Sequence, residues 1–417
     1  MNSEWSNYKL GDLLTIKHGF AFKGEHFASE GRYILLTPGN FYESGGFKFT
    51  PEKEKYYLGA FPKEYICSKG DLVVAMTEQA EGLLGSTAMV PTDDSFLHNQ
   101  RIGRISFDER RIDKTFLYYL FRIQSVRKQI KGSASGTKVK HTSPERIYDV
   151  KVSIPPVTIQ KRVAAILSVL DGKIELNNRT NVDLEAIAKT LYGYWFTQFD
   201  FPDKSGKPYK SSGGKMVWHE ELKREIPDSE GWRVGSLLDI AEYVNGLPCQ
   251  KFRPIGDGIL RVIKIKEMHD GFSEGTEHVR SDIPPKAIIE DGDILFSWSA
   301  SLEVQIWAGG RAALNQHIFK VASQQYPKSF YYYQLINYLQ HFKMMAENRK
   351  TTMGHITQEH LEQSRIALPP KKLTEKLEDI IAPIFTKIVN NKIENRKLSE
   401  LRDWLLPMLV NGQVKVG

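Results

Sequence analysis

The chain has 417 residues, a length that suits two or three domains better than one compact core. Its 57 lysines and arginines exceed its 50 aspartates and glutamates, and the formal net charge of +7 gives a mild preference for polyanionic partners. No apolar run approaches the roughly 18 residues that span a bilayer, and residues 1–9 lack the apolar core of a signal peptide. We therefore expect a cytoplasmic protein that makes no contact with a membrane.

Cysteine and histidine give no sign of a disulfide or a metal site. Cys67 and Cys249 are the only two cysteines, too few for a disulfide framework or a cysteine-rich zinc site. We expect both to be buried or incidental thiols. The 11 histidines show no spacing typical of metal ligands, so we expect no metal on this chain.

The most informative feature of the chain is an internal repeat, which indicates a duplicated fold. Residues 154–156 (Ile-Pro-Pro) recur as residues 368–370 (Leu-Pro-Pro), a shift of 214 residues. Asn99-Gln100 recurs as Asn315-Gln316 with a shift of 216, and the Gly-Asp pair at residue 70 recurs at residue 292 with a shift of 222. The matches keep their order while the offset drifts, as expected when loops differ in length. We infer two globular units of about 150 residues, each followed by one long helix.

Both long segments have apolar residues or asparagines at steps of three and four, the seam of a coiled coil. In the first segment the seam positions are Ile159, Val163, Ile166, Leu170, Ile174, Asn177, Asn181, Leu184, Ala188, Leu191 and Trp195. In the second they are Leu373, Leu377, Ile380, Ile384, Ile388, Asn391, Asn395, Leu398, Arg402, Leu405 and Leu409. A helix this long with one apolar stripe needs a partner, and the obvious partner is its own repeat.

We predict that the two helices pair in antiparallel fashion with their ends in register. Ile159 would then face Leu409, and Asn177 would face Asn391 as a buried pair that fixes the register. The alternative is that both seams face other subunits. Pro383 should kink the second helix or mark a late start, and Pro407 should end it.

The globular units should mix strands and helices. Residues 72–76 and 294–296 each follow a Gly-Asp turn and have the composition of buried strands. Residues 116–120 match residues 330–333, and their aromatic side chains have helical spacing. These aromatic residues favour core packing over a platform for stacking bases. Residues 200–232, rich in Pro, Gly, Ser and Lys, have the composition of a linker or long extension.

A polar, basic segment precedes each Pro-Pro pair and is our first candidate for DNA contact. Small residues allow the backbone to approach a phosphate, and Lys, Arg, Ser and Thr contact phosphates or base edges. The candidate residues are Lys131, Thr137, Lys138, Lys140 and His141 in the first unit, and Arg349, Lys350, Thr351, Thr352 and His355 in the second. The alternative is a solvated loop, but recurrence at the same place in both units favours a binding role.

The repeated Asn-Gln pair is a second candidate, because Asn and Gln pair bidentately with adenine. Gln100, Arg101 and Gln316 are the residues that we assign to DNA contact on this ground. A structural hydrogen-bonding role for these segments explains the repeat equally well.

Motifs for catalysis are missing. Both Pro-Pro pairs lack the leading Asn and the aromatic residue of an amino-methyltransferase turn. Residues 212–216 (Ser-Gly-Gly-Lys-Met) lack the spacing and the Ser or Thr of a phosphate-binding loop. We expect no catalytic residue and no cofactor on this chain.

The chain resembles the specificity subunits of type I restriction-modification enzymes along its whole length. The resemblance lies in residues 199–218 (FDFPDKSGKPYKSSGGKMVW) with residues 226–232 (IPDSEGW), in LNQHIF at residues 314–319, and in LRDWLLPMLVNGQVKV at residues 401–416. The Pro-Pro pairs followed by long helices are also typical of this family.

The resemblance implies an α+β fold with two mixed α/β target-recognition domains, separated by a long antiparallel two-helix coiled coil in pseudo-two-fold arrangement. Residues 1–157 would form the first recognition domain, 158–199 the first helical region, 200–372 a linker with the second recognition domain, and 373–417 the second helical region.

By this resemblance each recognition domain reads one half of a bipartite site on double-stranded DNA, and the helices dock two modification (methyltransferase) subunits and restriction subunits. S-adenosylmethionine, ATP and magnesium would bind those partners. An alternative is the specificity subunit of a related system whose partner fuses nuclease and methyltransferase. A self-sufficient enzyme and a purely structural scaffold are the two further readings, which the missing motifs and the matched basic segments disfavour.

Overall fold

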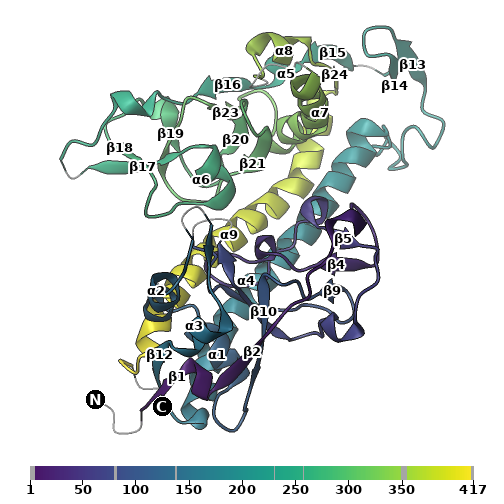
Figure 1. Cartoon of the computed structure of the whole chain (residues 1–417). Coiled ribbons are helices and arrows are strands. Elements are labelled where there is room, and N and C mark those ends of the chain that lie inside the picture. The colour runs from purple at the N-terminus through teal and green to yellow at the C-terminus, as the bar shows by residue number, and fades with distance from the viewer. Residues whose placement is uncertain are drawn as a thin grey trace. The chain divides into compact units, whose positions relative to one another are not determined.

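The computed structural model describes residues 5–78, 82–136, 139–229, 231–256, 258–348 and 355–414 (Figure 1). The chain divides into two units. Unit 1 comprises Met1–Gly172 and Leu398–Gly417, and unit 2 comprises Lys173–Lys397. Two long helices, α4 (Val157–Tyr192) and α9 (Lys371–Val410), contribute to both units. Among the described residues, no helix combines the length and apolar character needed to cross a membrane.

Unit 1 is built on two four-stranded sheets. The first has the order β2-β10-β6-β8, with β2 (Leu14–His18), β10 (Ile102–Phe107), β6 (Leu72–Ala75) and β8 (Thr87–Met89). The second has the order β3-β5-β4-β9, with β3 (Phe27–Ala28), β5 (Tyr56–Tyr57), β4 (Tyr33–Leu35) and β9 (Phe96–Leu97). Two strand pairs complete it: β1 (Ser6–Lys9) with β12 (Lys151–Ile154), and β7 (Thr77–Glu78) with β11 (Lys140–His141). Its helices are α1 (Lys114–Leu120), α2 (Gln124–Gly132) and α3 (Pro144–Tyr148).

Unit 2 repeats the first sheet of unit 1 and three of the four strands of the second sheet. Its first sheet has the order β16-β23-β20-β21, with β16 (Glu242–Asn245), β23 (Ile318–Ala322), β20 (Ile294–Ser297) and β21 (Glu303–Ile306). Its second has the order β18-β17-β22-β19, with β18 (His278–Arg280), β17 (Ile259–Ile263), β22 (Ala312–Leu314) and β19 (Ile288–Ile289). The fourth strand of the second sheet lies beside β5 in unit 1 and beside β22 in unit 2. The pair β15 (Arg233–Ser236) with β24 (Arg365–Leu368) corresponds to β1 with β12. Its helices are α5 (Leu237–Ile240), α6 (Ile265–Asp270), α7 (Lys328–Asn348) and α8 (Gln358–Gln363). The duplicated fold predicted from the sequence repeat is confirmed.

The strands β6 and β20 are buried on both faces, which explains their largely apolar sequences. All four residues of β6 and all four residues of β20 are at most 1% exposed. A strand in this position has no polar face, so the sequence shows a continuous apolar run without alternation. The aromatic residues Phe116 and Tyr119 of α1 and Phe330 of α7 lie in the same cores, as predicted. Cys67 and Cys249 are buried free thiols, and burial raises the pKa of Cys67 to about 12.

The helices α4 and α9 pack against each other in antiparallel fashion within each unit. In unit 1, Val163 and Leu167 of α4 share a core with Leu406 and Leu409 of α9. In unit 2, the later part of α4 packs with the earlier part of α9 through Ala188 and Tyr192 against the residues Leu377, Ile381 and Phe385. Antiparallel pairing is therefore confirmed. The helix α9 is continuous through Pro383 and Pro407, so the predicted late start at Pro383 and the predicted end at Pro407 are wrong.

The predicted seam is wrong at one equivalent position of each helix. Ile166 and Ile380 are 38% and 45% exposed, whereas the next residues, Leu167 and Ile381, are fully buried. The preceding seam residues Val163 and Leu377 are buried as predicted. These turns pack onto the core of their globular unit, so the buried face departs from the coiled-coil seam at the same position of both repeats.

The register of the helix pair also differs from the prediction. Asn177 Nδ2 donates to Asn395 Oδ1 at 2.9 Å, and Asn391 Nδ2 donates to Asn181 Oδ1 at 2.8 Å. Asn177 therefore meets Asn395, one helical turn beyond the predicted partner Asn391. The shift of 214 residues converts one of these pairs into the other, so the repeat relation holds within this segment of unit 2.

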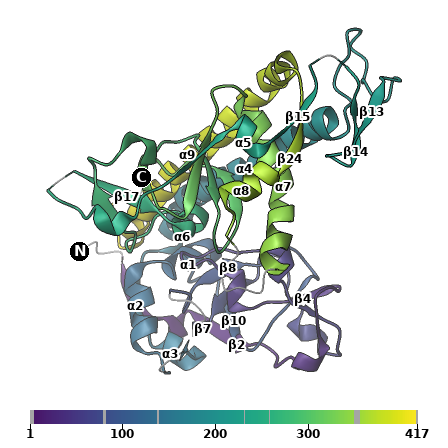
Figure 2. The same cartoon turned by 90° about the horizontal axis from the view of Figure 1, so that it is seen from above.

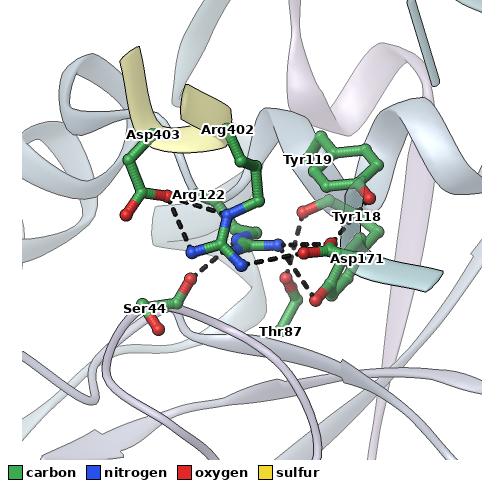
Figure 3. A network of polar contacts seen from close by, with 8 residues as sticks. All are labelled: Ser44, Thr87, Tyr118, Tyr119, Arg122, Asp171, Arg402 and Asp403. Atoms are coloured by element: carbon green, nitrogen blue, oxygen red, sulfur yellow. Dashed lines mark hydrogen bonds and ion pairs between the residues drawn. The ribbon is translucent and has the colours of Figure 1, made fainter. Parts of the chain in front are cut away.

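At the equivalent place in the two units, the packing of α4 and α9 is ionic in one and apolar in the other. In unit 1, Asp171 lies between Arg122 and Arg402, beside Tyr118 and Tyr119 (Figure 3). The 214-residue shift converts these five residues into Phe385, Ile336, Ala188, Tyr332 and Tyr333. In unit 2 the ring of Phe385 packs against Tyr332 and Tyr333, with centroids 5.3 and 5.8 Å apart.

Residues 200–232 are folded onto unit 2. They contain a two-stranded hairpin, β13 (Met216–His219) with β14 (Arg224–Pro227), which Figure 2 shows beside β15 and β24. Phe201 and Ile226 are buried in the core of unit 2, and Phe201 stacks on Tyr209 at 4.8 Å. Of the two predictions for this segment, a long extension agrees with the structure and a free linker does not.

Candidate DNA interface

The two candidate DNA-contact segments of unit 1 meet at one residue, Met76. Met76 N donates to the carbonyl of Arg101 at 3.0 Å, and Thr142 N donates to the carbonyl of Met76 at 3.0 Å. Next to it, β7 pairs with β11, which places His141 opposite Thr77. The Asn-Gln turn and the basic segment, about 40 residues apart in the chain, therefore form one continuous surface.

Unit 2 has the same arrangement around Trp298. Trp298 N donates to the carbonyl of His317 at 3.3 Å, and Ile356 N donates to the carbonyl of Trp298 at 3.0 Å. His317 and Ile356 occupy the repeat positions of Arg101 and Thr142. Two equivalent segments are thus brought together by two equivalent pairs of backbone hydrogen bonds.

In each unit, a glycine allows a neighbouring backbone segment to lie close enough to the Asn-Gln turn to hydrogen-bond with it. In unit 1, Phe20 N donates to the carbonyl of His98 at 2.8 Å, and Gln100 N donates to the carbonyl of Phe20 at 3.0 Å. A Cβ on Gly19 would lie 2.1 Å from the carbonyl oxygen of Asn99, so only glycine allows this approach.

The glycine before the turn of unit 2 is held in the same way. Leu247 N donates to the carbonyl of Leu314 at 2.8 Å, and Gln316 N donates to the carbonyl of Leu247 at 3.0 Å. A Cβ on Gly246 would lie 2.3 Å from the carbonyl oxygen of Asn315. The turn is therefore a rigid element of both units.

The asparagine of each turn has a structural role. Asn99 Oδ1 accepts a hydrogen bond from Arg101 N at 3.2 Å, and Asn315 Oδ1 accepts one from His317 N at 3.3 Å. These contacts close an Asx-type turn, in which the side chain replaces a backbone acceptor. The following residue then points outward: Gln100 is exposed and Gln316 is half-buried.

Buried His98 supports the turn of unit 1 from the core. Its Nε2 lies 2.8 Å from the carbonyl of Ile102, and the imidazole is fully buried. Because a carbonyl only accepts, Nε2 carries the proton. Burial lowers the pKa of His98 to about 4, since the charged imidazolium would lose its hydration.

The described residues on either side of the basic segment of unit 1 are joined by backbone hydrogen bonds. Ser135 and His141 exchange backbone hydrogen bonds of 3.0 and 2.8 Å, and His141 Nδ1 lies 3.1 Å from Thr77 Oγ1. Arg146 Nη1 donates to Ser135 Oγ at 2.8 Å and adds a cation that the sequence did not single out. Lys131 and His141 are exposed, and Lys140 is half-buried.

In unit 2 the exposed His355 lies against Trp298, with ring centroids 5.3 Å apart. Six predicted contact residues lie outside the described residues: Thr137, Lys138, Arg349, Lys350, Thr351 and Thr352. Trp298 and Asn245 are further residues of this surface that the sequence did not single out, and buried Met76 joins its segments in unit 1. Their signal was weak, because Met76 and Trp298 both directly follow the repeated apolar strand but are chemically unlike.

The predicted helix-seam residues have two degrees of burial. Asn177, Asn181, Ile388 and Asn391 are buried, and Ile174, Leu184, Asn395 and Leu398 are half-buried. Asn177 also donates to Glu394 Oε2 at 2.8 Å, and Lys173 lies 3.3 Å from the same carboxylate. Hydrogen bonds from Asn177 and Lys173 lower the pKa of Glu394, so the carboxylate stays ionised.

Comparisons with known proteins agree with this duplicated architecture. The chain matches the type I restriction modification DNA specificity domain twice, at residues 2–186 and 229–403. It therefore belongs to the family of type I restriction-modification specificity subunits, proteins of DNA sequence recognition.

Two curated relatives illustrate the similarity. The type I restriction enzyme MjaIX specificity subunit of Methanocaldococcus jannaschii is 26% identical over 310 residues, covering 72% of this chain and 69% of the relative. The HindI specificity subunit of Haemophilus influenzae is 22% identical, covering 99% of this chain and all of the relative. Among solved structures, the S subunit of the type I restriction-modification system from M. genitalium has the same fold, with a TM-score of 0.57 at 15% identity, covering 100% of this chain and 98% of that one.

Proposed function

We propose that each unit reads one half of a bipartite DNA site through the surface formed by its Asn-Gln turn and its basic segment, which meet at buried Met76 in unit 1 and at Trp298 in unit 2. The observation that carries this proposal is the repetition of the surface: the same turn and the same basic segment meet through equivalent backbone hydrogen bonds. Two similar but non-identical surfaces suit two different half-sites. Exposed Gln100, Arg101 and His141 present donors and acceptors to base edges and phosphates.

The helix pair would dock two copies of a modification subunit. Ile166 and Ile380 are equivalent by the repeat and are 38% and 45% exposed; Ile187 and Leu401 are also equivalent and are 51% and 43% exposed. Each unit thus carries one residue of each exposed apolar pair. Apolar residues kept at equivalent exposed positions suit a protein partner that binds twice, in the same manner, to the two ends of the helix pair.

Chemistry would belong to the partner subunits. We assign DNA recognition to this chain and adenine or cytosine methylation, with S-adenosylmethionine, to the modification subunits. Restriction subunits would use ATP and magnesium. This division follows from the absence of methyltransferase and phosphate-loop motifs in the sequence.

The test is to map methylated bases in DNA from cells that express this chain with its modification partner, and from cells that lack this chain alone. We expect a bipartite motif only in the first. Identical methylation in both would refute the proposal, because the partner would then choose its own sites.

A further inference from the structure

Trp298 and Met76 occupy equivalent positions, but only the side chain of Trp298 reaches the surface. Met76 is 2% exposed and packs into the core of unit 1. Trp298 is half-buried and reaches the surface of unit 2. The two units therefore share the same backbone hydrogen bonds at residues 76 and 298, but they differ in the side chain at this position.

The indole of Trp298 fixes the orientation of Asn245. Trp298 Nε1 lies 3.0 Å from Asn245 Oδ1, at the end of β16. An indole N–H can only donate, so the amide oxygen of Asn245 must point toward it. The amide nitrogen of this exposed side chain then points the other way, and no described residue accepts a hydrogen bond from it.

The same indole packs against residues from two other segments of the surface. Its ring lies 5.5 Å from His317 of the Asn-Gln turn and 5.3 Å from His355 of the basic segment. Phe319, which is buried, lies 5.8 Å away and anchors the indole to the core. One side chain thus orders polar groups from three segments that are far apart in the sequence.

We propose that Trp298 is a positioning residue that makes Asn245 a one-way hydrogen-bond donor to DNA in the half-site read by unit 2. The inference rests on the proposed function. Because one lone pair of its oxygen already accepts from the indole, Asn245 is less suited to the bidentate pair with adenine, which requires both an amide donor and an amide acceptor. Its free N–H groups suit a base that presents an acceptor in the major groove: guanine, with N7 and O6, or thymine, with O4.

Unit 1 has other residues at the positions of the Trp298–Asn245 hydrogen bond. The residue before its turn glycine is His18, where unit 2 has Asn245 before Gly246, and the side chain of Met76 offers no N–H donor. The effect of changing Trp298 should therefore be confined to one half-site, and the half-site of unit 1 becomes an internal control.

The test uses the full chain assembled with its modification partner, and maps the methylated motif for wild type and Trp298→Phe. Phenylalanine keeps an aromatic ring at this position and removes the N–H together with the pyrrole part of the indole. We expect relaxed preference at one base position of the unit 2 half-site, where the disfavoured bases gain roughly tenfold in methylation rate. The unit 1 half-site and the melting temperature should stay unchanged.

Trp218→Phe is the matched control. Trp218 lies in the same unit, on the β13–β14 hairpin, and its Nε1 also donates to a side chain, Glu220 Oε1 at 2.9 Å. This variant should leave the motif unchanged. If it relaxes the same base position, the effect reflects general loosening of unit 2 and the proposal is wrong.

Asn245→Asp tests the donor itself without disturbing the core, because residue 245 is exposed. Aspartate still accepts from Trp298 but offers no N–H and adds a negative charge. We expect at least a tenfold loss of methylation at the motif, and Asn245→Ala should relax the same base position as Trp298→Phe. An unaltered motif and rate in Trp298→Phe and Asn245→Asp would overturn the inference, whereas a wild-type chain without any bipartite motif would overturn the proposed function.

Discussion

Asp171 and Arg402, which lie 231 residues apart in the sequence, form a hydrogen-bonded ion pair of 2.8 Å between Oδ1 and Nη1. Arg122, whose side chain is 3% exposed, binds the other carboxylate oxygen at 3.2 Å, and Tyr119 donates to it at 2.7 Å (Figure 3). Burial alone would raise the pKa of Asp171, but the hydrogen bond from Arg402 and the charge of Arg122 outweigh it and lower the pKa. The carboxylate therefore joins α1, α4 and α9 within unit 1.

Removing this carboxylate should destabilise the protein strongly. Asp171→Ala leaves Arg122 and Arg402 close together without their shared counter-ion, and breaking a buried pair in this way costs about 3–5 kcal/mol. We expect a lower midpoint in urea unfolding followed by circular dichroism. The matched control replaces Arg122, Asp171 and Arg402 together by Ile, Phe and Ala, the residues that unit 2 has at these positions. It should lose less stability than the single variant; an equal or larger loss would show that the ionic cluster is not exchangeable with the apolar one.

The stability of unit 1 should depend on pH through His98. Its folded pKa of about 4 lies below the ordinary value of 6.5, so the unfolded chain binds the proton more readily. The contribution of neutral His98 is therefore complete above pH 6.5 and is lost as the pH falls from 6.5 toward 4. In His98→Gln the melting temperature should fall less over this range than in wild type. Parallel curves for the two proteins would argue that His98 does not titrate in this way.

The asparagine pairs should matter for register more than for stability. Asn391→Leu leaves Asn181 Oδ1 without its partner in a buried position, which costs about 1–3 kcal/mol. Replacing Asn181 and Asn391 together by Leu should recover much of that loss, because no buried polar group is left unpaired. Urea unfolding of the two variants checks this, and a double variant less stable than the single one would contradict it.

Contact between Arg101 and a phosphate should appear in the salt dependence of DNA binding. For the complex with the modification partner, Arg101→Ala should reduce the slope of log K against log salt by about 0.9, one phosphate contact. Lys223→Ala is the control, since Lys223 is exposed on the β13–β14 hairpin and paired with Glu220 at 2.9 Å. Equal slopes for wild type and Arg101→Ala would remove this residue from the phosphate contacts.

The sequence predicted the duplicated fold well, because the Gly-Asp turns, the Asn-Gln pairs and the Pro-Pro pairs recur in order and each marks the start or end of an element. The helix register was harder to predict. Asn177 and Asn181 are one helical turn apart, as are Asn391 and Asn395, so a slip by one turn still pairs one asparagine with another. The predicted register pairs only Asn177 with Asn391 and sets Asn181 opposite Lys387, whereas the observed register pairs all four asparagines.

The centre of the proposed DNA surface was equally hard to predict. Met76 and Trp298 join the two segments through backbone hydrogen bonds. Such bonds do not depend on the side chain, so the residue type at these positions does not indicate them. Gly19 and Gly246 are required for their close approach to Asn99 and Asn315, but each is only a single glycine in the sequence. The candidates Gln100 and Gln316 were found because the neighbouring asparagine is repeated, and that asparagine closes the turn.

The assignment of one half-site to each unit can be tested by mapping the methylated motif for Gln100→Ala and for Gln316→Ala, each in the full chain with its modification partner. We expect Gln100→Ala to alter one half of the motif and leave the other intact, and Gln316→Ala to do the reverse. If either variant alters both halves, or if both variants alter the same half, the assignment of one half-site to each unit is wrong.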